Sequence, residues 1–251
     1  MDKMVLFSGG AAVGKIAVLR HVVSALRDAD ALPAVCKIDC VGDDDRRVFA
    51  ELGVPAVAGI SGDVCPDHFL VSNLPELWAW TEAQQASHLL IETAGLCHRC
   101  SPATRQMLAG CVIDCTASCR TPGRLGPMLT QADFAVVAKT DMVSQAEREI
   151  ICSNIERINP AAEVFCVDAL AGYGIEALCD YLLAQPPTPT YENDALRHTM
   201  PMGVCSYCVG ERRVGTAFQQ GIVGKIDFSG SSGSDLLDPS TAEGGAPCQA
   251  I

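Results

Sequence analysis

Apolar residues are grouped in two alternating patterns along most of this chain. Short, mostly apolar runs are typical of buried strands, and they recur at residues 4–7, 34–38, 88–92, 112–114, 134–138 and 163–167. Longer segments with apolar residues at helical spacing separate most of these runs, and the clearest are residues 16–28, 74–86, 144–158 and 174–183. This alternation predicts an α/β fold, with a mainly parallel sheet covered by helices on both faces.

The pattern changes after Ala184. Residues 1–184 hold every predicted strand, whereas the proline-rich residues 185–199 can continue neither a helix nor a sheet ladder. A short module at residues 200–228 contains two cysteines, and the Gly- and Ser-rich residues 229–251 have the composition of a disordered tail. We therefore expect one α/β domain, a linker, a small cysteine-containing module and a tail.

Composition narrows the partners and the compartment. The 251 residues are 49% hydrophobic and carry a formal net charge of −12. A full core is therefore available, whereas nucleic acid and anionic membrane surfaces, which need clustered Lys and Arg, are excluded as partners. No run approaches the roughly 20 apolar residues of a membrane span, and the first strand begins too early for a signal peptide, so we expect a cytoplasmic protein. Fourteen cysteines in a reducing compartment indicate metal binding or thiol chemistry rather than a disulfide framework.

A glycine loop links the first predicted strand to the first predicted helix. It consists of Gly9, Gly10, Ala11, Ala12, Val13, Gly14 and Lys15, and Ile16 follows it. A strand, such a loop and a helix in this order form a phosphate-binding P-loop, in which backbone N–H groups hold phosphate oxygens and Lys15 neutralises the outer phosphates. The next residue should be Ser or Thr, whose hydroxyl ligates Mg²⁺, and here it is Ile16. The loop predicts binding of a nucleoside di- or triphosphate and leaves hydrolysis open.

Acidic residues at two strand ends extend this site. Glu92 ends the predicted strand 88–92, and Gly95 follows shortly after it. In P-loop proteins a carboxylate at this place reaches Mg²⁺ or its water, and a glycine N–H meets the γ-phosphate. Asp39, at the end of the second strand, is a further candidate for the same network. Lys15, Asp39 and Glu92 are therefore the candidate catalytic residues.

A base-recognition segment follows the strand 134–138. Lys139 and Asp141 resemble the guanine-reading motif Asn-Lys-x-Asp of GTPases, with Ala138 in place of the Asn. In that motif the Asp accepts two hydrogen bonds from guanine and the Lys stem packs along the base. Asp168 and Ala169 occupy the place of a Ser-Ala pair that contacts the base. These residues favour GTP, bound with Mg²⁺, and leave ATP as the alternative.

Together these motifs resemble the SIMIBI-class GTPases that insert nickel, namely the hydrogenase and urease maturation factors, and their cobalamin-associated, CobW-like relatives. The resemblance covers roughly residues 4–183 and rests on the P-loop, on Ile91-Glu92-Thr93-Ala94-Gly95, on Ala138-Lys139-Thr140-Asp141 and on the segment from Leu52-Gly53-Val54-Pro55 to Cys65-Pro66-Asp67-His68. It implies GTP-dependent dimerisation and delivery of a metal ion to a client metalloenzyme, together with that enzyme's assembly factors.

The last of these segments carries a candidate metal site. Urease-type members bind nickel through Cys-Pro-His, and one extra residue here gives Cys65-Pro66-Asp67-His68. Cys65 and His68 can converge on one ion, with Asp67 as an oxygen ligand. The alternative is a turn before a helix with a half-buried thiol.

Two further cysteine pairs are candidate ligands. Cys97, His98 and Cys100 follow Gly95 in the predicted nucleotide-sensing switch, where two thiolates at this spacing suit zinc, another transition metal or a cluster iron. A homodimer would supply four thiolates by symmetry. Cys205 and Cys208 either complete that site or form an intersubunit site of their own. By contrast, we expect a core role for five cysteines in apolar segments, namely Cys36, Cys111, Cys152, Cys166 and Cys179.

Three functions fit these residues. The first is a dimeric metallochaperone gated by nucleotide, carrying nickel, zinc or cobalt to a client enzyme. The second is an ATP-dependent iron–sulfur carrier or reductase, in which cysteine pairs from two subunits hold one [4Fe–4S] cluster. The third is a nucleotide-binding module that does not hydrolyse, because Ile16 removes a ligand from the transition-state clamp.

Overall fold

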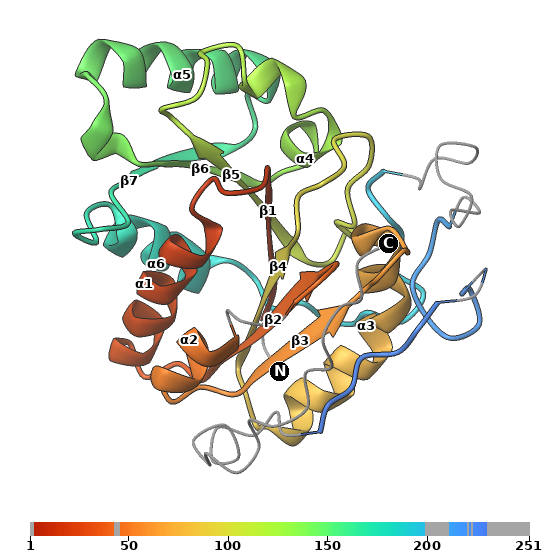
Figure 1. The fold of residues 1–251 in the computed structure, drawn as a ribbon. Coiled ribbons are helices and arrows are strands. Elements are labelled where there is room, and N and C mark those ends of the chain that lie inside the picture. The colour runs from red at the N-terminus through yellow and green to blue at the C-terminus, as the bar shows by residue number, and fades with distance from the viewer. Residues whose placement is uncertain (1–2, 43–45, 199–210, 220, 222, 230–251) are drawn as a thin grey trace, which may run out of the picture.

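The structure is a computed structural model that describes residues 3–42, 46–198, 211–219, 221 and 223–229. Helices and strands alternate along it (Figure 1). The strands are β1 (Lys3–Gly9), β2 (Pro33–Asp39), β3 (Ala56–Ile60), β4 (His88–Thr93), β5 (Leu108–Asp114), β6 (Phe134–Ala138) and β7 (Glu163–Val167). The helices are α1 (Lys15–Asp28), α2 (Arg46–Glu51), α3 (Pro66–Ala83), α4 (Pro127–Thr130), α5 (Gln145–Ile158) and α6 (Ile175–Ala184), with short 3₁₀ turns at Pro122–Arg124 and Thr140–Met142.

All seven strands pair in parallel in one sheet, in the order β3-β2-β4-β1-β5-β6-β7. β1 is central, and its Leu6 lies opposite Ile91 of β4 and Ala109 of β5. The predicted α/β class with a mainly parallel sheet is confirmed. Because parallel strands end at the same edge, the loops after β1, β2, β4 and β6 meet at the carboxyl edge of the sheet, where ligands of such sheets bind.

The alternation of side chains along β1 divides the core between the two faces of the sheet. Met4 and Leu6 pack with Phe69, Leu74 and other residues of α3, whereas Val5 and Phe7 pack with α1 and α6. A third cluster joins α4 and α5 to β5 and β6, on the face that also carries α3. Helices therefore cover both faces, as the apolar runs predicted (Figure 1).

The short helices α2 and α4 were not predicted, β5 is longer than predicted, and two further elements differ for reasons that the sequence explains. β3 was not predicted, because its sequence Ala-Val-Ala-Gly-Ile holds few strongly β-forming residues. α3 was expected to begin at residue 74, but it begins at Pro66 and contains Pro75. Residues 66–74 are buried on every side, so they lack the one-sided apolar pattern that identifies a surface helix.

Residues 185–198 and the described part of residues 211–229 lie against the α/β domain. The Thr188 hydroxyl accepts a hydrogen bond from the Met4 N–H at 3.0 Å, and the Arg197 guanidinium binds both carboxylate oxygens of Asp133 at 2.8 and 2.7 Å. Asn73 of α3 donates to the Gly224 carbonyl and accepts from the Ile226 N–H, each at 3.0 Å. The Lys225 amine donates to the Ser72 carbonyl, which lies in the turn of α3 just before Pro75. This C-terminal segment therefore covers α3.

Within the part of the chain that the structure describes, no helix has both the length and the apolar composition that crossing a membrane requires.

Candidate functional site

The P-loop makes a tight turn from β1 into α1. Gly9 at φ +138° and Gly14 at φ +98° have backbone conformations that L side chains rarely adopt, and Ala12 is left-handed at φ +58°. A Cβ on Gly9 would lie 2.3 Å from the Val112 carbonyl oxygen of β5. Glycine is therefore required where the loop passes the neighbouring strand, and α1 begins at the carboxyl edge of the sheet with its positive end toward the loop.

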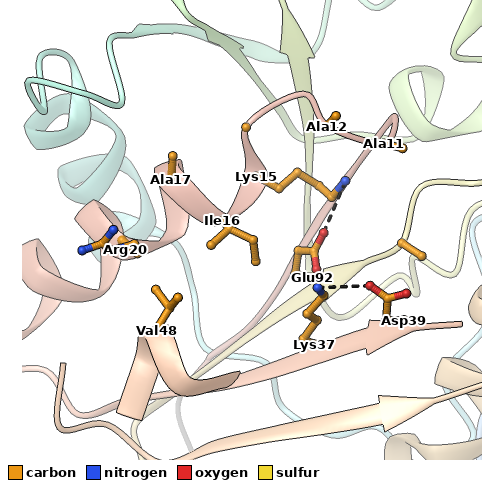
Figure 2. Close-up of a pocket in the computed structure, with 12 residues that line it drawn as sticks. Ala11, Ala12, Lys15, Ile16, Ala17, Arg20, Lys37, Asp39, Val48 and Glu92 are labelled. Atoms are coloured by element: carbon orange, nitrogen blue, oxygen red, sulfur yellow. Dashed lines mark ion pairs between the residues drawn. The ribbon is translucent and has the colours of Figure 1, made fainter. Parts of the chain in front are cut away.

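Lys15, the first residue of α1, is almost fully buried and folds back over the loop (Figure 2). Its Nζ donates to the Gly10 carbonyl at 2.8 Å and to the Gly9 carbonyl at 3.2 Å, and it pairs with Glu92 Oε1 at 3.3 Å. The candidate residues of the P-loop and of the β4 end, which are far apart in sequence, are thus in contact.

A cavity lies beside this contact. Its volume of about 510 Å³ is within the usual range for ligand pockets. Its walls include the predicted residues Ala11, Ala12, Gly14, Lys15, Ile16, Asp39 and Glu92 (Figure 2). Lys37 and Arg20 add two positive charges that the sequence analysis did not single out. The cavity therefore combines a P-loop, three basic side chains and two carboxylates.

Burial and the two lysines set the charges of these carboxylates. Burial raises the pKa of Glu92 to about 7, although the charges of Lys15 and Lys37 act in the opposite direction. For Asp39, partial burial is outweighed by Lys37, whose Nζ lies 3.1 Å from Oδ2, and by the N–H groups of Cys40 and Val41, so its pKa is lowered. Two carboxylates in one cavity thus differ in acidity, with Glu92 able to exchange a proton near neutral pH.

Ile16 occupies the position of the magnesium-ligating hydroxyl. Its half-buried side chain packs against the apolar cluster of α1 and also lines the cavity. It supplies no oxygen, so any Mg²⁺ at this place depends on the carboxylates, the nucleotide and water.

The loop after β4 contacts the P-loop closely at Gly95. At φ +70°, a Cβ on Gly95 would lie 1.8 Å from the Gly9 carbonyl oxygen. The loop that continues to Cys97, His98 and Cys100 therefore begins in direct contact with the predicted phosphate site.

The base-recognition residues are only partly assembled around the P-loop. Lys139, left-handed at φ +62°, donates to the Ala12 carbonyl at 3.2 Å and pairs with Asp114 at 2.6 Å, so its stem crosses the P-loop. Asp141 is exposed in the following turn. The Asp168 carboxylate accepts from the N–H groups of Leu170 and Ala171, and it thereby holds its own turn. The carbonyl of the adjacent Ala169 lies 2.8 Å from His21 Nε2 of α1.

A second cluster of chemical groups lies between the start of α3 and the loop after β4. Ligand atoms of Cys65, Asp67 and Cys100 lie within 4.8 Å of one another, and the Cys100 thiol donates to Asp67 Oδ2 at 3.1 Å. Cys65 is the N-cap of α3, and Asp67 lies in its first turn. Two thiols and a carboxylate from separate segments are therefore brought together.

Each group in this cluster affects the charge of the others. Contact with the Cys100 side chain and the N–H groups of His68 and Asp67 at the helix start outweigh burial and lower the pKa of Cys65 to about 6. Burial and the nearby Cys65 charge raise the pKa of Asp67 to about 7, and the pKa of Cys100 is raised strongly by the Cys65 sulfur and by burial. The cluster thus gathers more potential negative charge than its surroundings neutralise, which suits a bound cation.

The other predicted ligands lie elsewhere. His68 faces away into a buried contact, with its Nε2 2.8 Å from Glu211 Oε1. Cys97 packs partly buried against the α3 core cluster, and exposed His98 has Nδ1 3.2 Å from the Arg124 carbonyl oxygen. Cys205 and Cys208 lie outside the described residues.

Comparison with known proteins decides the family. The family model of the CobW/HypB/UreG nucleotide-binding domain matches residues 3–166. The chain belongs to this family. The chain is 40% identical over 225 residues to the uncharacterised protein MJ0120 of Methanocaldococcus jannaschii, and the aligned region covers 90% of this chain and 96% of that protein.

A second relative and a solved structure agree with this assignment. Urease accessory protein UreG 2 of Streptomyces griseus is 28% identical over 200 residues, which span 72% of this chain and 88% of that protein. The crystal structure of hydrogenase maturation factor HypB from Archaeoglobus fulgidus superposes with a TM-score of 0.60 over 72% of this chain and 89% of that chain, at 19% identity, and so shares the fold. The predicted resemblance to the CobW/HypB/UreG GTPases is confirmed.

Sequence reasoning did not find several residues that complete this CobW/HypB/UreG domain. Lys37 is two residues before Asp39 on β2, and Asp114 ends β5 as Asp39 ends β2, so a search for charged residues at strand ends would have identified both. Glu211 had no such signal, because only the folded chain brings it to His68.

Proposed function

We propose that this protein is a GTP-gated metallochaperone that acts in the cytoplasm as a homodimer and carries a transition-metal ion to a client metalloenzyme or its assembly factors. The proposal rests on the cluster of Cys65, Asp67 and Cys100. Cys100 lies on the loop after β4, which contacts the P-loop through Gly95. The metal is cargo in this account.

The donor set fits a borderline transition metal. Two thiolates and one carboxylate suit nickel, zinc or cobalt rather than Mg²⁺ or Ca²⁺, which prefer oxygen alone. Three protein groups leave at least one coordination position open, as a cargo site needs for transfer. The lowered pKa of Cys65 supplies one thiolate at neutral pH, and a bound cation would favour loss of the remaining protons from Asp67 and Cys100.

The loop after β4 supports gating by the nucleotide. Gly95 has no room for a side chain against Gly9, so a γ-phosphate bound over the P-loop would press directly on this loop. Cys100 is five residues further along the same loop. A shift of the loop would change the separation of Cys100 from Cys65, which is fixed at the start of α3.

The base side supports GTP as the nucleotide, bound with Mg²⁺. Lys139 crosses the P-loop, where its stem can pack along a bound base, and Asp141 follows it in an exposed turn where a base can reach it. We assign phosphate contacts to Gly9–Lys15, including Val13 and Gly14, base contacts to Lys139, Asp141 and residues 168–169, and the metal–water network to Asp39 and Glu92.

Dimerisation is supported by apolar side chains at the carboxyl edge of the sheet. Val41 after β2, Ile60 at the end of β3 and Leu96 after β4 are all exposed, and these three strands are neighbours. A second copy across this edge would cover them and bring two loops with Cys97 and Cys100 together. Cys208 precedes Glu211 by three residues, and Glu211 is bound to His68, so a role of Cys205 and Cys208 near this site remains a prediction.

Anaerobic metal titration of the full chain tests the proposal. Nickel, zinc and cobalt are each titrated into the wild type, C65S, D67N and C100S, with C119S as the control because Cys119 is an exposed thiol away from the cluster. We expect binding at stoichiometric metal in the wild type and in C119S, and at least tenfold weaker binding in C65S and C100S. Equal binding by all five proteins, or iron and sulfide in matching amounts, would contradict the proposal.

A further inference from the structure

A second close pair of thiols lies at the β7 edge of the sheet, away from β2 and β4, whose ends line the cavity. Cys152 of α5 and Cys166 of β7 have their Sγ atoms 3.6 Å apart. Both are half-buried at the border of the cluster that α4 and α5 form with β5 and β6. The sequence analysis grouped them with core cysteines, and Cys36, Cys111 and Cys179 are indeed buried, but this pair retains exposed surface.

The spacing of this pair suits a covalent bond. A disulfide has its sulfurs about 2.05 Å apart, so the two sulfurs need to approach by about 1.5 Å, which small side-chain rotations can supply. The bond would join residues on two adjacent elements, α5 and β7, and would need no rearrangement of the sheet. The half-buried position also leaves access for a small oxidant.

The surroundings of the pair favour one thiolate shared between two neighbouring sulfurs. The Cys152 and Cys166 thiols contact each other, with either able to donate, and the Arg148 guanidinium on the preceding turn of α5 lies close to Cys166. Against the effect of burial, these groups lower the pKa of Cys166 to about 7, whereas Cys166 and burial raise the pKa of Cys152. Glu156 and Cys115 are the other titratable groups that face the pair, and the Cys115 thiol is engaged with the Lys139 carbonyl at 3.0 Å.

We propose that Cys152 and Cys166 form a modification site, a dithiol that a low-molecular-weight disulfide such as glutathione disulfide oxidises reversibly to an intrachain disulfide. The Cys166 thiolate attacks one sulfur of glutathione disulfide and releases one glutathione thiolate. The Cys152 sulfur, after losing its proton, attacks the Cys166 sulfur of this mixed disulfide and releases the second glutathione thiolate. Two protein thiols are oxidised, one glutathione disulfide is reduced to two glutathiones, and the protons of the thiols pass to these leaving groups.

This site is separate from the proposed metal cluster. The two cysteines lie on elements next to the proposed base-contacting residues. α5, which carries Cys152, follows the turn Thr140–Met142, and β7, which carries Cys166, leads into Asp168. A bond between them would tie α5 to β7 and stabilise this half of the domain. The inference does not depend on metal or nucleotide binding.

Peptide analysis after equilibration in glutathione redox buffers tests the proposal. The full chain with C65S and C100S is used, because these substitutions remove the thiols of the Cys65–Asp67–Cys100 cluster from the described part of the chain. After alkylation and trypsin digestion without reductant, we expect residues 149–157, which contain Cys152, to be linked to residues 158–197. Fragment-ion sequencing distinguishes Cys166 from Cys179, which lies on the same second peptide. Dithiothreitol should separate the peptides, and the oxidised protein should melt roughly 5 °C higher than the reduced protein.

Adding C152S, or separately C166S in case the first variant folds poorly, should abolish both the linked peptide and the rise in melting temperature. Exposed Cys119 reports that the oxidant is active, because it should carry glutathione under the same conditions. Glutathione on Cys119 without the linked peptide, or a link from Cys152 to Cys179, would overturn the proposal.

Discussion

Glu92 and Asp67 are buried carboxylates that hold their protons more tightly than in water, and each lies at a place where a cation is expected. Burial raises the pKa of both to about 7. Glu92 faces Lys15 across 3.3 Å, whereas Asp67 faces the Cys100 thiol at 3.1 Å. Ionisation of each carboxyl group is therefore unfavourable in the fold, and a bound cation would make it more favourable.

The raised pKa of Glu92 makes stability depend on pH. Because the folded chain binds this proton more tightly than the unfolded chain, ionisation removes stability as the pH rises from about 4.5 to about 7. We expect the free energy of unfolding of E92Q, relative to the wild type, to increase by about 3 kcal/mol across this window. Urea unfolding of both proteins at a series of pH values measures this. Parallel pH profiles would show that Glu92 is not protonated in the fold.

Ile16 should limit hydrolysis. In I16T a hydroxyl returns to the position that ligates Mg²⁺, and we expect GTP hydrolysis to increase on the order of tenfold. I16V is the matched control, because Val has the shape of Thr without the hydroxyl. Steady-state phosphate release measures the rates, and equal rates for I16T and I16V would mean that the missing ligand is not the limiting defect.

Gly95 should be essential for nucleotide binding. A methyl group in G95A would collide with the Gly9 carbonyl and would also strain a backbone at φ +70°. We expect GDP affinity at least tenfold weaker by calorimetry. G123A is the control, since a Cβ on Gly123 meets nothing within 4 Å. Wild-type affinity in G95A would contradict the close contact of the two loops.

At the scale of elements, the sequence predicts the helices and strands whose apolar pattern or capping residues lie within the element itself. The helix α5 lies within the predicted residues 144–158 and begins with a capping box between Ser144 and Glu147, and β6 and β7 have the predicted bounds. The start of α3 could not be predicted in this way, because described residues of the C-terminal segment, among them Val214, Gly224 and Ile226, cover its first half and are more than 130 residues away in sequence. The Cys65–Cys100 contact is also not local, because it joins residues on two different segments of the chain, whereas the P-loop is contiguous and is identified directly.

The contact of α3 with the C-terminal segment should contribute to stability. Asn73 is fully buried and bridges the Phe69 and Gly224 carbonyls and the Ile226 N–H. We expect N73A to lose about 2–3 kcal/mol, because it leaves buried backbone groups without partners. N154A, which removes two exposed hydrogen bonds, one to the Cys119 carbonyl and one from the Arg157 guanidinium, should lose less than about 1 kcal/mol. Denaturant unfolding compares the two, and equal losses would contradict the role of Asn73.

At the scale of the molecule, the two candidate sites share one loop. The CobW/HypB/UreG domain places the phosphate site and the Cys65–Asp67–Cys100 cluster at the same edge of the sheet, and the residues from Gly95 to Cys100 connect them. Because the two sites share this loop, we expect nucleotide binding and metal binding to be coupled. Such coupling is reciprocal. If a nucleotide weakens metal binding, the metal-loaded protein binds that nucleotide less tightly by the same factor.

The most direct test is the dissociation constant of the metal in two nucleotide states. The metal identified by titration is measured by competition with a chelator, in full-length protein saturated with GDP or with a non-hydrolysable GTP analogue, both with Mg²⁺. The account predicts that the two constants differ by at least fivefold in the wild type, and that C100S loses both tight binding and the difference. Equal constants in the two nucleotide states, with nucleotide and metal both bound, would contradict it.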